Sequence, residues 1–349
     1  MGKTGVILFN IGTPSSPNTE DVKKYLLRFL MDKDVIHLPY PLRWLLVHGI
    51  IVPRRAKASA EKYRKIWLKE GSPLEVYSKN FADKLQAELG SNYLVKIGMR
   101  YSEPSIKTAV ESLIAEQVTS LLLVPMFPQY AEATTGSVLK EFYRVLKSTQ
   151  EAKPSIQIVR DFFAHSSFVE SSKKIILDTL KDAEVDHYLF SFHGLPESHI
   201  RKNKGCLISE DCCFEKSACE KPCYRAQCFA SATQIAEALN LKPSHWSLSF
   251  QSRLGRGEWL KPSTDHTLEI LAKTGKKNVA VISPSFVADC IETLEEIGIE
   301  ARAHFKTFGG ENLHLIPCLN ADDFWVKQFA QVLKNFENIS DLPKNDRKI

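Results

Sequence analysis

The sequence predicts an α/β protein of two similar domains, each a parallel β-sheet flanked by helices. Two observations support this fold class. Short apolar runs of strand length alternate with segments of helical spacing along the chain, as in sheets covered on both faces. Two stretches of the first half are also echoed in the second half. A chain of 349 residues is long enough for two domains of ordinary size.

The first half begins with a buried strand and then alternates helices with strands. Residues 5–14 form an apolar run that stops at a Gly and Pro turn. Residues 16–30 have helical spacing, with acidic side chains in the first turn. The remaining pattern predicts helices at 59–68 and 76–89, a strand at 93–101, a helix at 106–116, a strand at 120–125 and a helix at 136–146.

The second half starts again with a strand, and a histidine stands at its carboxyl end. The run from Tyr188 to Phe192 is apolar, with charge before it and Gly194 and Pro196 after it. Ligands of open parallel sheets bind at the carboxyl ends of the strands. His193 therefore lies where a ligand site is expected, although a hydrogen-bonded core histidine is the ordinary alternative.

Two short segments of each half can be aligned, 7–14 with 189–196 and 123–127 with 282–286. The first alignment places Ile11 opposite His193, and the second places Ala133 opposite Glu292. These echoes indicate an ancestral duplication of one α/β unit. The polar chemistry is then concentrated in the second copy.

Three carboxylates follow the second aligned run. On a helix, Asp289, Glu292 and Glu296 lie at i, i+3 and i+7 and form one stripe. Like charges in such a row repel each other, and a bound cation would relieve that repulsion. Together with His193 they form a set suited to a divalent first-row metal such as Fe²⁺, and a neutral imidazole accepts protons near neutral pH. A solvated acidic face is the ordinary alternative.

Composition and charge limit the possible partners and location. The balance of 46 basic and 41 acidic residues gives a net charge of +5, which implies no strong field for nucleic acid. The first residues lack the features of a secretory signal, so a cytoplasmic location is expected. Residues 38–55 are apolar but interrupted, and a bilayer span takes roughly 20 apolar residues. This segment fits peripheral membrane contact, the lip of a pocket or plain core packing.

Motifs along nearly the whole chain resemble those of the ferrochelatases, the enzymes that insert Fe²⁺ into a porphyrin to make haem. They lie at 9–36 (FNIGTPSSPNTEDVKKYLLRFLMDKDVI), 63–74 (YRKIWLKEGSPL), 97–106 (IGMRYSEPSI), 125–137 (PMFPQYAEATTGS), 190–199 (FSFHGLPESH), 249–262 (SFQSRLGRGEWLKP), 288–297 (ADCIETLEEI) and 316–321 (IPCLNA). The resemblance implies two Rossmann-like domains with an active-site cleft between them. It also implies a lyase that releases two protons as Fe²⁺ enters the porphyrin, with protoporphyrin IX as the expected acceptor.

The resemblance assigns expected roles by position. His193 and Glu292 correspond to the catalytic pair that takes the pyrrole protons or binds iron. Asp289 and Glu296 correspond to a path for metal or protons. The positions expected near the porphyrin are Ile11, Arg100, Tyr101 and Trp259. Residues 38–55 correspond to a hydrophobic lip, beside which Arg43, Arg54 and Arg55 suit the porphyrin propionates.

Six of the eight cysteines lie between Cys206 and Cys228. Without an export signal, this clustering favours a metal centre over disulfides. Compared with the usual bacterial members, residues 202–228 resemble an enlarged, cysteine-rich insert, and some ferrochelatases carry a [2Fe–2S] cluster. A cluster takes four thiolates, and the expected ligands are Cys206, Cys213, Cys219 and Cys223, with Cys212 as the alternate. Zinc held by four thiolates is the alternative.

The predicted division of the chain has three parts. Residues 1–165 form an α/β domain with the hydrophobic lip, residues 166–315 form an α/β domain with the metal site and the insert, and residues 316–349 form a helix and a tail. Two other functions stay open from the sequence. One is a non-catalytic tetrapyrrole or metal carrier, and the other is an iron–sulfur redox protein, which no flavin or nicotinamide motif supports.

Overall fold

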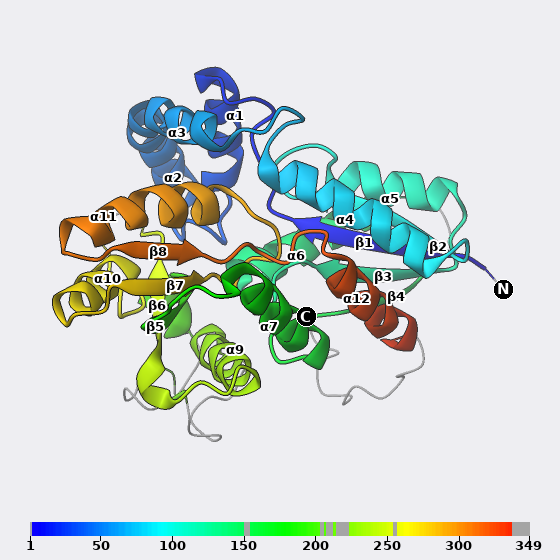
Figure 1. Ribbon diagram of the computed structural model, residues 1–349. Coiled ribbons are helices and arrows are strands. Elements are labelled where there is room, and N and C mark those ends of the chain that lie inside the picture. Colours follow the sequence, from blue (N-terminus) through cyan, green and yellow to red (C-terminus); the bar gives the residue numbers. More distant parts are fainter. Residues whose placement is uncertain are drawn as a thin grey trace.

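The computed structural model describes residues 2–149, 154–202, 206, 212–213, 223–253 and 257–336. Two four-stranded parallel sheets confirm the predicted fold class, and helices flank both of them (Figure 1). The first sheet has the order β2-β1-β3-β4, from β1 (Thr4–Asn10), β2 (Tyr93–Met99), β3 (Ser120–Pro125) and β4 (Ser155–Ile158). The second has the order β6-β5-β7-β8, from β5 (His187–His193), β6 (Trp246–Gln251), β7 (Asn278–Ile282) and β8 (Asn312–Leu315).

The two sheets share one topology, in which the first strand of each half is the second strand in space. The aligned segments therefore fall on equivalent strands, β1 with β5 and β3 with β7. A π-helix follows the third strand of each half, η2 (Glu132–Gly136) in the first and η4 (Ile291–Ala301) in the second. Ala133 and Glu292 are the second residues of these helices. The topology thus supports the internal duplication that the sequence indicates.

The helices of the first half surround its sheet and extend beyond it. They are α1 (Thr19–Leu30), α2 (Tyr40–Leu46), η1 (Val47–Ile51), α3 (Val52–Ile66), α4 (Pro73–Leu89), α5 (Ile106–Ala115) and α6 (Ser137–Ser148). The helix predicted at 59–68 starts earlier, because the segment 40–66 is helical almost throughout. Pro41 and Pro53 lie within it at the first or second position of a helix, where a missing N–H costs no hydrogen bond.

The helices of the second half follow the same alternating pattern. They are α7 (Ser166–Leu180), α8 (Glu197–Ile200), α9 (Tyr224–Ala238), the short 3₁₀ turn η3 (Pro243–His245), α10 (Thr264–Lys273), α11 (Arg302–Thr307) and α12 (Asp323–Phe336). The last of these packs on α4 of the first half and on α7 of the second. Phe81 and Trp325 stack at this contact, and Phe329 packs beside them at the centre of the largest core cluster.

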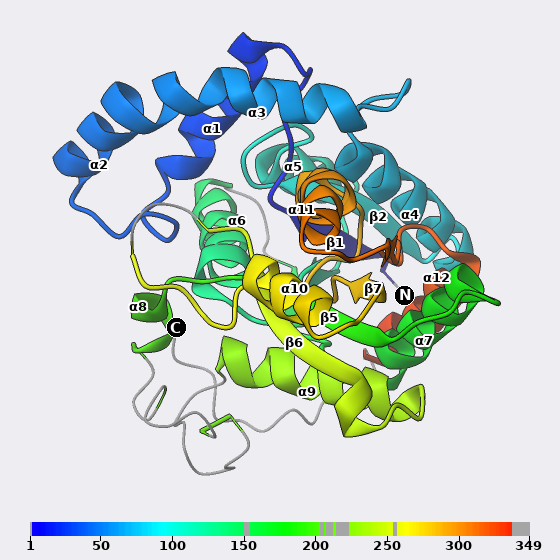
Figure 2. The ribbon, with the colours of Figure 1, turned by 60° about the vertical axis from the view of Figure 1, so that its left-hand side comes forward.

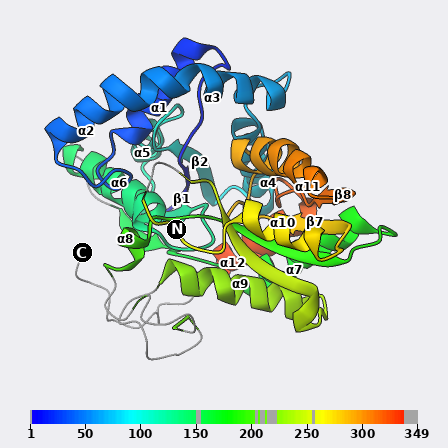
Figure 3. The same ribbon diagram turned by 90° about the vertical axis from the view of Figure 1, so that its left-hand side faces the viewer.

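The helices α1, α2 and α3 form a layer above the second half (Figures 2 and 3). The contact between α3 and η4 closes this layer against the π-helix that carries Glu292. Ion pairs reinforce it, because Glu295 on η4 is fully buried and meets Lys62 at 3.0 Å and Lys65 at 2.9 Å. Among the described residues, no helix combines the length and the apolar character that a membrane crossing requires.

Candidate functional site

A cleft of about 1410 Å³ lies between the two halves. Its walls come from the carboxyl ends of β1 and β5, the layer of α1 and α3, and the π-helix η4. Drug-sized ligands occupy pockets of about 300–1,000 Å³, so this cleft has room for a larger molecule. The walls include apolar side chains such as Ile11, Leu46 and Trp259 together with His193 and Glu292. The cleft is therefore a mostly apolar space with polar groups on the walls of both halves.

His193 is held at the end of β5 by hydrogen bonds to both of its backbone groups. Its N–H donates to Ser285 Oγ at 2.9 Å, and its carbonyl accepts from the Tyr224 hydroxyl at 2.7 Å. The ring Nδ1 lies 2.6 Å from the carbonyl oxygen of Gly194. A carbonyl oxygen only accepts, so Nδ1 carries the proton of the neutral ring and Nε2 carries the lone pair. The imidazole is thus fixed in the tautomer that offers Nε2 as a base or a ligand.

Gly194 is required by the close approach of two strand ends. A Cβ at this position would lie 2.8 Å from the carbonyl oxygen of Gln251 and 3.3 Å from the ring of Trp259. The Gly194 N–H donates to that same carbonyl at 2.7 Å. A side chain there would push the strand end that carries His193 away from β6.

Gln251 ties η4 to the edge of the second sheet. Its side-chain Nε2 donates to the carbonyl of Glu292 at 2.8 Å, and its Oε1 accepts from Ser191 Oγ at 2.7 Å. Gln251 is buried, so both bonds lie away from solvent, where an unmade bond would be costly. Gln251 therefore fixes the start of the helix that carries Glu292.

Glu296 is one helical turn further along η4 and faces the same cleft. Its carboxylate accepts from the Ser252 N–H at 2.7 Å and from the Ser252 hydroxyl. Burial raises the pKa of Glu296 to about 7, and the nearby charge of Glu292 acts in the same direction, while the bonds from Ser252 oppose the shift. Ser252 has a positive φ of 64°, a backbone conformation that the sequence pattern does not reveal.

The stripe predicted from Asp289, Glu292 and Glu296 is wrong at its first member. Asp289 precedes the helix, because Cys290 is extended and caps η4. The Asp289 carboxylate is buried and accepts from Thr293 Oγ1 at 2.8 Å and from Asn320 Nδ2 at 2.7 Å. Asp289 is not among the described residues that line the cleft. The physical reason is the extended residue at 290, which breaks the helical spacing on which the stripe was based.

The row of carboxylates continues instead at Glu300, which also lines the cleft. Glu292, Glu296 and Glu300 are spaced by four residues, a spacing that stays near one face of a π-helix. Lys62 on α3 pairs with Glu300 and Glu295 at the outer end of this row. Sequence reasoning missed Glu300, although its distance of four residues from Glu296 was a usable signal, and it missed Lys62, for which no local signal exists.

Proteins of similar sequence identify the family of this chain. The ferrochelatase family model matches residues 3–336. The ferrochelatase of Bdellovibrio bacteriovorus is 60% identical over 335 residues, which cover 96% of this chain and 100% of that protein. The ferrochelatases of Coxiella burnetii (43% identical, 95% of this chain and 93% of that protein) and Legionella pneumophila (42%, 95% and 98%) are further relatives.

The chain belongs to the ferrochelatase family.

Two solved structures share the fold of this ferrochelatase family member. SirB from Bacillus subtilis with Fe³⁺ superimposes with a TM-score of 0.58 at 10% identity, covering 97% of both chains. The sirohydrochlorin chelatase SirB from Bacillus subtilis subspecies spizizenii, in complex with cobalt, gives 0.54 at 9% identity with the same coverage. At this identity the likeness concerns the arrangement of helices and strands alone.

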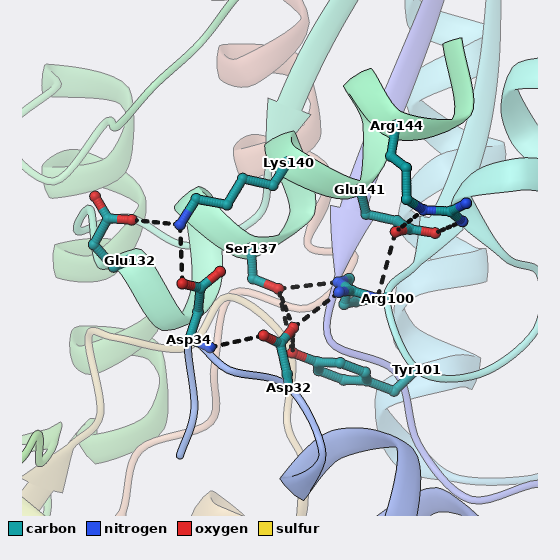
Figure 4. Close-up of polar contacts among 9 residues, drawn as sticks. All are labelled: Asp32, Asp34, Arg100, Tyr101, Glu132, Ser137, Lys140, Glu141 and Arg144. Atoms are coloured by element: carbon teal, nitrogen blue, oxygen red, sulfur yellow. Dashed lines mark hydrogen bonds and ion pairs between the residues drawn. The ribbon is translucent and has the colours of Figure 1, made fainter. Parts of the chain in front are cut away.

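Ile11 and Trp259 line the cleft, whereas Arg100 and Tyr101 are absent from its described wall. Figure 4 shows Arg100 and Tyr101 around the carboxylate of Asp32. Arg100 Nη2 lies 2.9 Å and the Tyr101 hydroxyl 2.8 Å from Asp32 Oδ2. Desolvation is the largest influence on the pKa of Asp32 and raises this pKa. Hydrogen bonds from Ser137, Tyr101 and other groups together outweigh desolvation, so the pKa lies below its ordinary value. Porphyrin contact by Arg100 and Tyr101 stays a prediction of the ferrochelatase resemblance.

The arginines of the lip lie in different surroundings. Arg43 is buried and donates to the carbonyls of Leu38 at 2.7 Å and Ile36 at 3.3 Å. Its guanidinium holds the lip together rather than facing the cleft, which corrects the expected role of Arg43 beside the propionates. Arg54 and Arg55 line the cleft from α3.

Four of the predicted cluster cysteines lie in the described part of the chain, and Cys219 lies outside it. The thiols of Cys213 and Cys206 hydrogen bond to that of Cys223, and the contact with Cys213 lowers the pKa of the Cys223 thiol. Arg225 Nη1 lies 3.2 Å from Cys213 Sγ and 3.8 Å from Cys212 Sγ. Across the ranges that the structure describes, no group of three or more His, Cys, Asp or Glu side chains is arranged to hold a metal ion.

The raised pKa of Glu296 predicts a pH-dependent effect on stability. Between about pH 4.5 and pH 7 the unfolded chain ionises this carboxyl while the folded chain keeps it protonated, so the free energy of unfolding falls as pH rises. Glu296→Gln removes this loss. We expect the variant to gain on the order of 1–3 kcal/mol relative to the parent between pH 5 and pH 7.5, measured by urea unfolding. Glu300→Gln is the control, and an equal gain in both variants would contradict the assignment.

Proposed function

We propose that this chain inserts Fe²⁺ into a porphyrin, protoporphyrin IX being the acceptor, and releases two protons. The observation that carries the proposal is the convergence of His193 from β5 and Glu292 from η4 on one large, mostly apolar cleft. Membership of the ferrochelatase family and the names of its relatives support the same reaction. A flat apolar macrocycle suits these walls, and Arg54 and Arg55 at the rim suit its carboxylates.

The proton chemistry follows from the tautomer of His193. Its Nε2 lone pair accepts a pyrrole proton, while the bond from Nδ1 to the Gly194 carbonyl stabilises the imidazolium that forms. Glu292, the second residue of η4, lines the same cleft and provides the opposite charge for Fe²⁺. The pKa of Glu296 near 7 allows it to exchange a proton with solvent at neutral pH. Asp289 acts through the packing at the start of η4.

Two substitutions separate the enzyme from a carrier that only binds porphyrin. His193→Ala and Glu292→Ala each lower the rate of Fe²⁺ insertion by roughly 10²–10⁴-fold, because a positioned base or charge is lost. Porphyrin affinity, measured by quenching of porphyrin fluorescence, changes little. Anaerobic assays with Fe²⁺ and either protoporphyrin or coproporphyrin report the insertion and the preferred acceptor. The exposed His245→Ala and Glu311→Ala serve as matched controls. Unchanged insertion in both site variants would contradict the roles of His193 and Glu292, whereas porphyrin binding without insertion by the parent would leave only the carrier.

We also propose that Cys206, Cys213, Cys219 and Cys223 hold a [2Fe–2S] cluster, with Cys212 as the alternate ligand. The contacts of the Cys213 and Cys206 thiols with Cys223, and the guanidinium of Arg225 beside Cys213, support this, because a cation beside thiols favours the thiolate form that iron requires. The cluster would supply a redox-active, sulfur-rich centre. Zinc on the same thiolates is the alternative.

The cluster predicts the colour of the purified protein. We expect visible absorption that dithionite bleaches, with about two iron and two sulfide per chain. Cys213→Ser loses this absorption, while Cys318→Ser, at a buried cysteine elsewhere in the fold, keeps it. A colourless protein with stoichiometric zinc would contradict the iron–sulfur proposal in favour of the alternative.

We further propose that the lip contacts a membrane surface from the cytoplasmic side. Exposed apolar side chains gather on and beside α2, where Tyr40 is 63%, Leu42 57% and Leu45 60% exposed. Trp44 and Ile50 extend the same apolar surface, and the cations of Arg54 and Arg55 follow on α3. An apolar surface next to positive charge binds anionic lipid headgroups.

Vesicle binding tests this surface. The protein should co-sediment with vesicles of phosphatidylcholine and phosphatidylserine, and less so with phosphatidylcholine alone. Leu42→Ser with Leu45→Ser should weaken sedimentation at least tenfold, since roughly 2–3 kcal/mol of buried apolar contact is removed. Leu177→Ser with Ile270→Ser, at exposed apolar positions on α7 and α10, is the control. Equal sedimentation of the two double variants would refute the contact.

A further inference from the structure

The backbone of His193 is fixed by two hydroxyl groups from other elements. Ser285, in the loop after β7, accepts from the His193 N–H at 2.9 Å. Tyr224, the first residue of α9, donates its hydroxyl to the His193 carbonyl at 2.7 Å. Tyr224 is buried, so this bond is shielded from water and its loss would leave a carbonyl without a partner.

Tyr224 also directly follows Cys223, which caps α9. The Cys223 thiol meets the thiols of Cys213 and Cys206, so one peptide bond separates the cysteine group from the residue that holds His193. The sequence offered no connection between these two sites. The structure supplies one, because a displacement of the Cys223 backbone moves the base of the Tyr224 side chain.

The start of α9 is attached to the rest of the cleft at further points. Gln227 Oε1 accepts from the Tyr130 N–H at 2.7 Å, and Ser231 Oγ accepts from Gln129 Nε2 at 3.0 Å. Gln129 Nε2 also lies 3.2 Å from the carbonyl of Pro284, the residue before Ser285. The amino-terminal half of α9 is therefore braced against both halves of the molecule. Because these bonds hold the rest of this half of the helix in place, we expect a displacement of its first turn to change the position of His193.

We propose that Tyr224 is a positioning residue for His193 and that it couples the cysteine group to the insertion reaction. The inference rests on the proposed role of His193 as the base. It assigns Tyr224 no contact with the reacting atoms. With the thiols held together, the first turn of α9 keeps the hydroxyl at the His193 carbonyl, and with the thiols apart the strand end loosens and Nε2 leaves its position.

Removal of a single hydroxyl tests the positioning role. Tyr224→Phe keeps the ring and should lower kcat about tenfold with KM for porphyrin within twofold, since displacements below 1 Å already impair a positioned base. Ser285→Ala should act alike, and Ser285→Thr, which retains the hydroxyl, should restore activity. Hydrogen exchange should rise in a peptide covering 190–196. Tyr188→Phe is the control, because Tyr188 is a half-buried tyrosine on β5, the strand that carries His193. This variant keeps the parental kcat.

The coupling is tested by combining variants. Cys213→Ser should lower kcat in the parent. In the Tyr224→Phe background the fold decrease in kcat should be less than half as large, because the hydrogen bond that links the cysteine group to His193 is already absent. Independent, multiplicative effects would overturn the coupling. Parental kcat in Tyr224→Phe would overturn the positioning role itself. A fully active His193→Ala would instead overturn the proposed function, so the two failures are distinguishable. Circular dichroism and porphyrin affinity confirm that each variant is folded.

Discussion

The hydrogen bond from Gln251 to the carbonyl of Glu292 is the interaction on which the site depends. It joins the carboxyl edge of the second sheet to the first turn of η4, and the side chain that makes it is anchored in turn by Ser191. The strand that provides His193 and the helix that provides Glu292 are thereby positioned by the same buried group. A buried amide with its polar atoms satisfied is rigid, because every alternative placement leaves one of them without a partner.

The cleft also needs a wall that the second half does not possess. That wall is the layer of α1, α2 and α3, which the first half inserts between β1 and β2. Glu295 fixes it, since a fully buried carboxylate is stable only with its cations, and both Lys62 and Lys65 come from α3. The apolar outer surface of α2 and the polar inner surface of α3 let one layer serve as a lip and as a wall of the cleft.

The structure also changes how the cysteine-rich segment is seen. In the sequence alone, nothing connects these cysteines to the cleft. In the fold, Cys223 caps the helix whose first residue holds the His193 carbonyl. A group bound at these thiols would therefore be mechanically adjacent to the proposed base, without any path for electrons being required.

Local sequence patterns were sufficient for most of the fold and for half of the site. Apolar runs that stop at Gly or Pro located β1, β3 and β5, and the run before Gly194 and Pro196 placed His193 at a strand end. Glu296 was found from helical spacing alone. Asp289 was misplaced on the helix because the extended conformation of Cys290 is set by the bonds of Asp289 to Asn320, a residue distant in sequence.

The sequence by itself thus determined the two-sheet architecture, the family, and the presence of one imidazole and several carboxylates at strand and helix ends. These depend on periodicity and turn chemistry, which act over a few residues. Only the tertiary structure decided that Arg43 and Arg100 are engaged with the protein itself, that Lys62 closes the outer end of the carboxylate row, and that Tyr224 holds His193. Arg43 bonds carbonyls only five and seven residues before it, but its burial is set by the packing of the lip. The contacts of Arg100, Lys62 and Tyr224 join residues far apart in the sequence, so no local pattern encodes them.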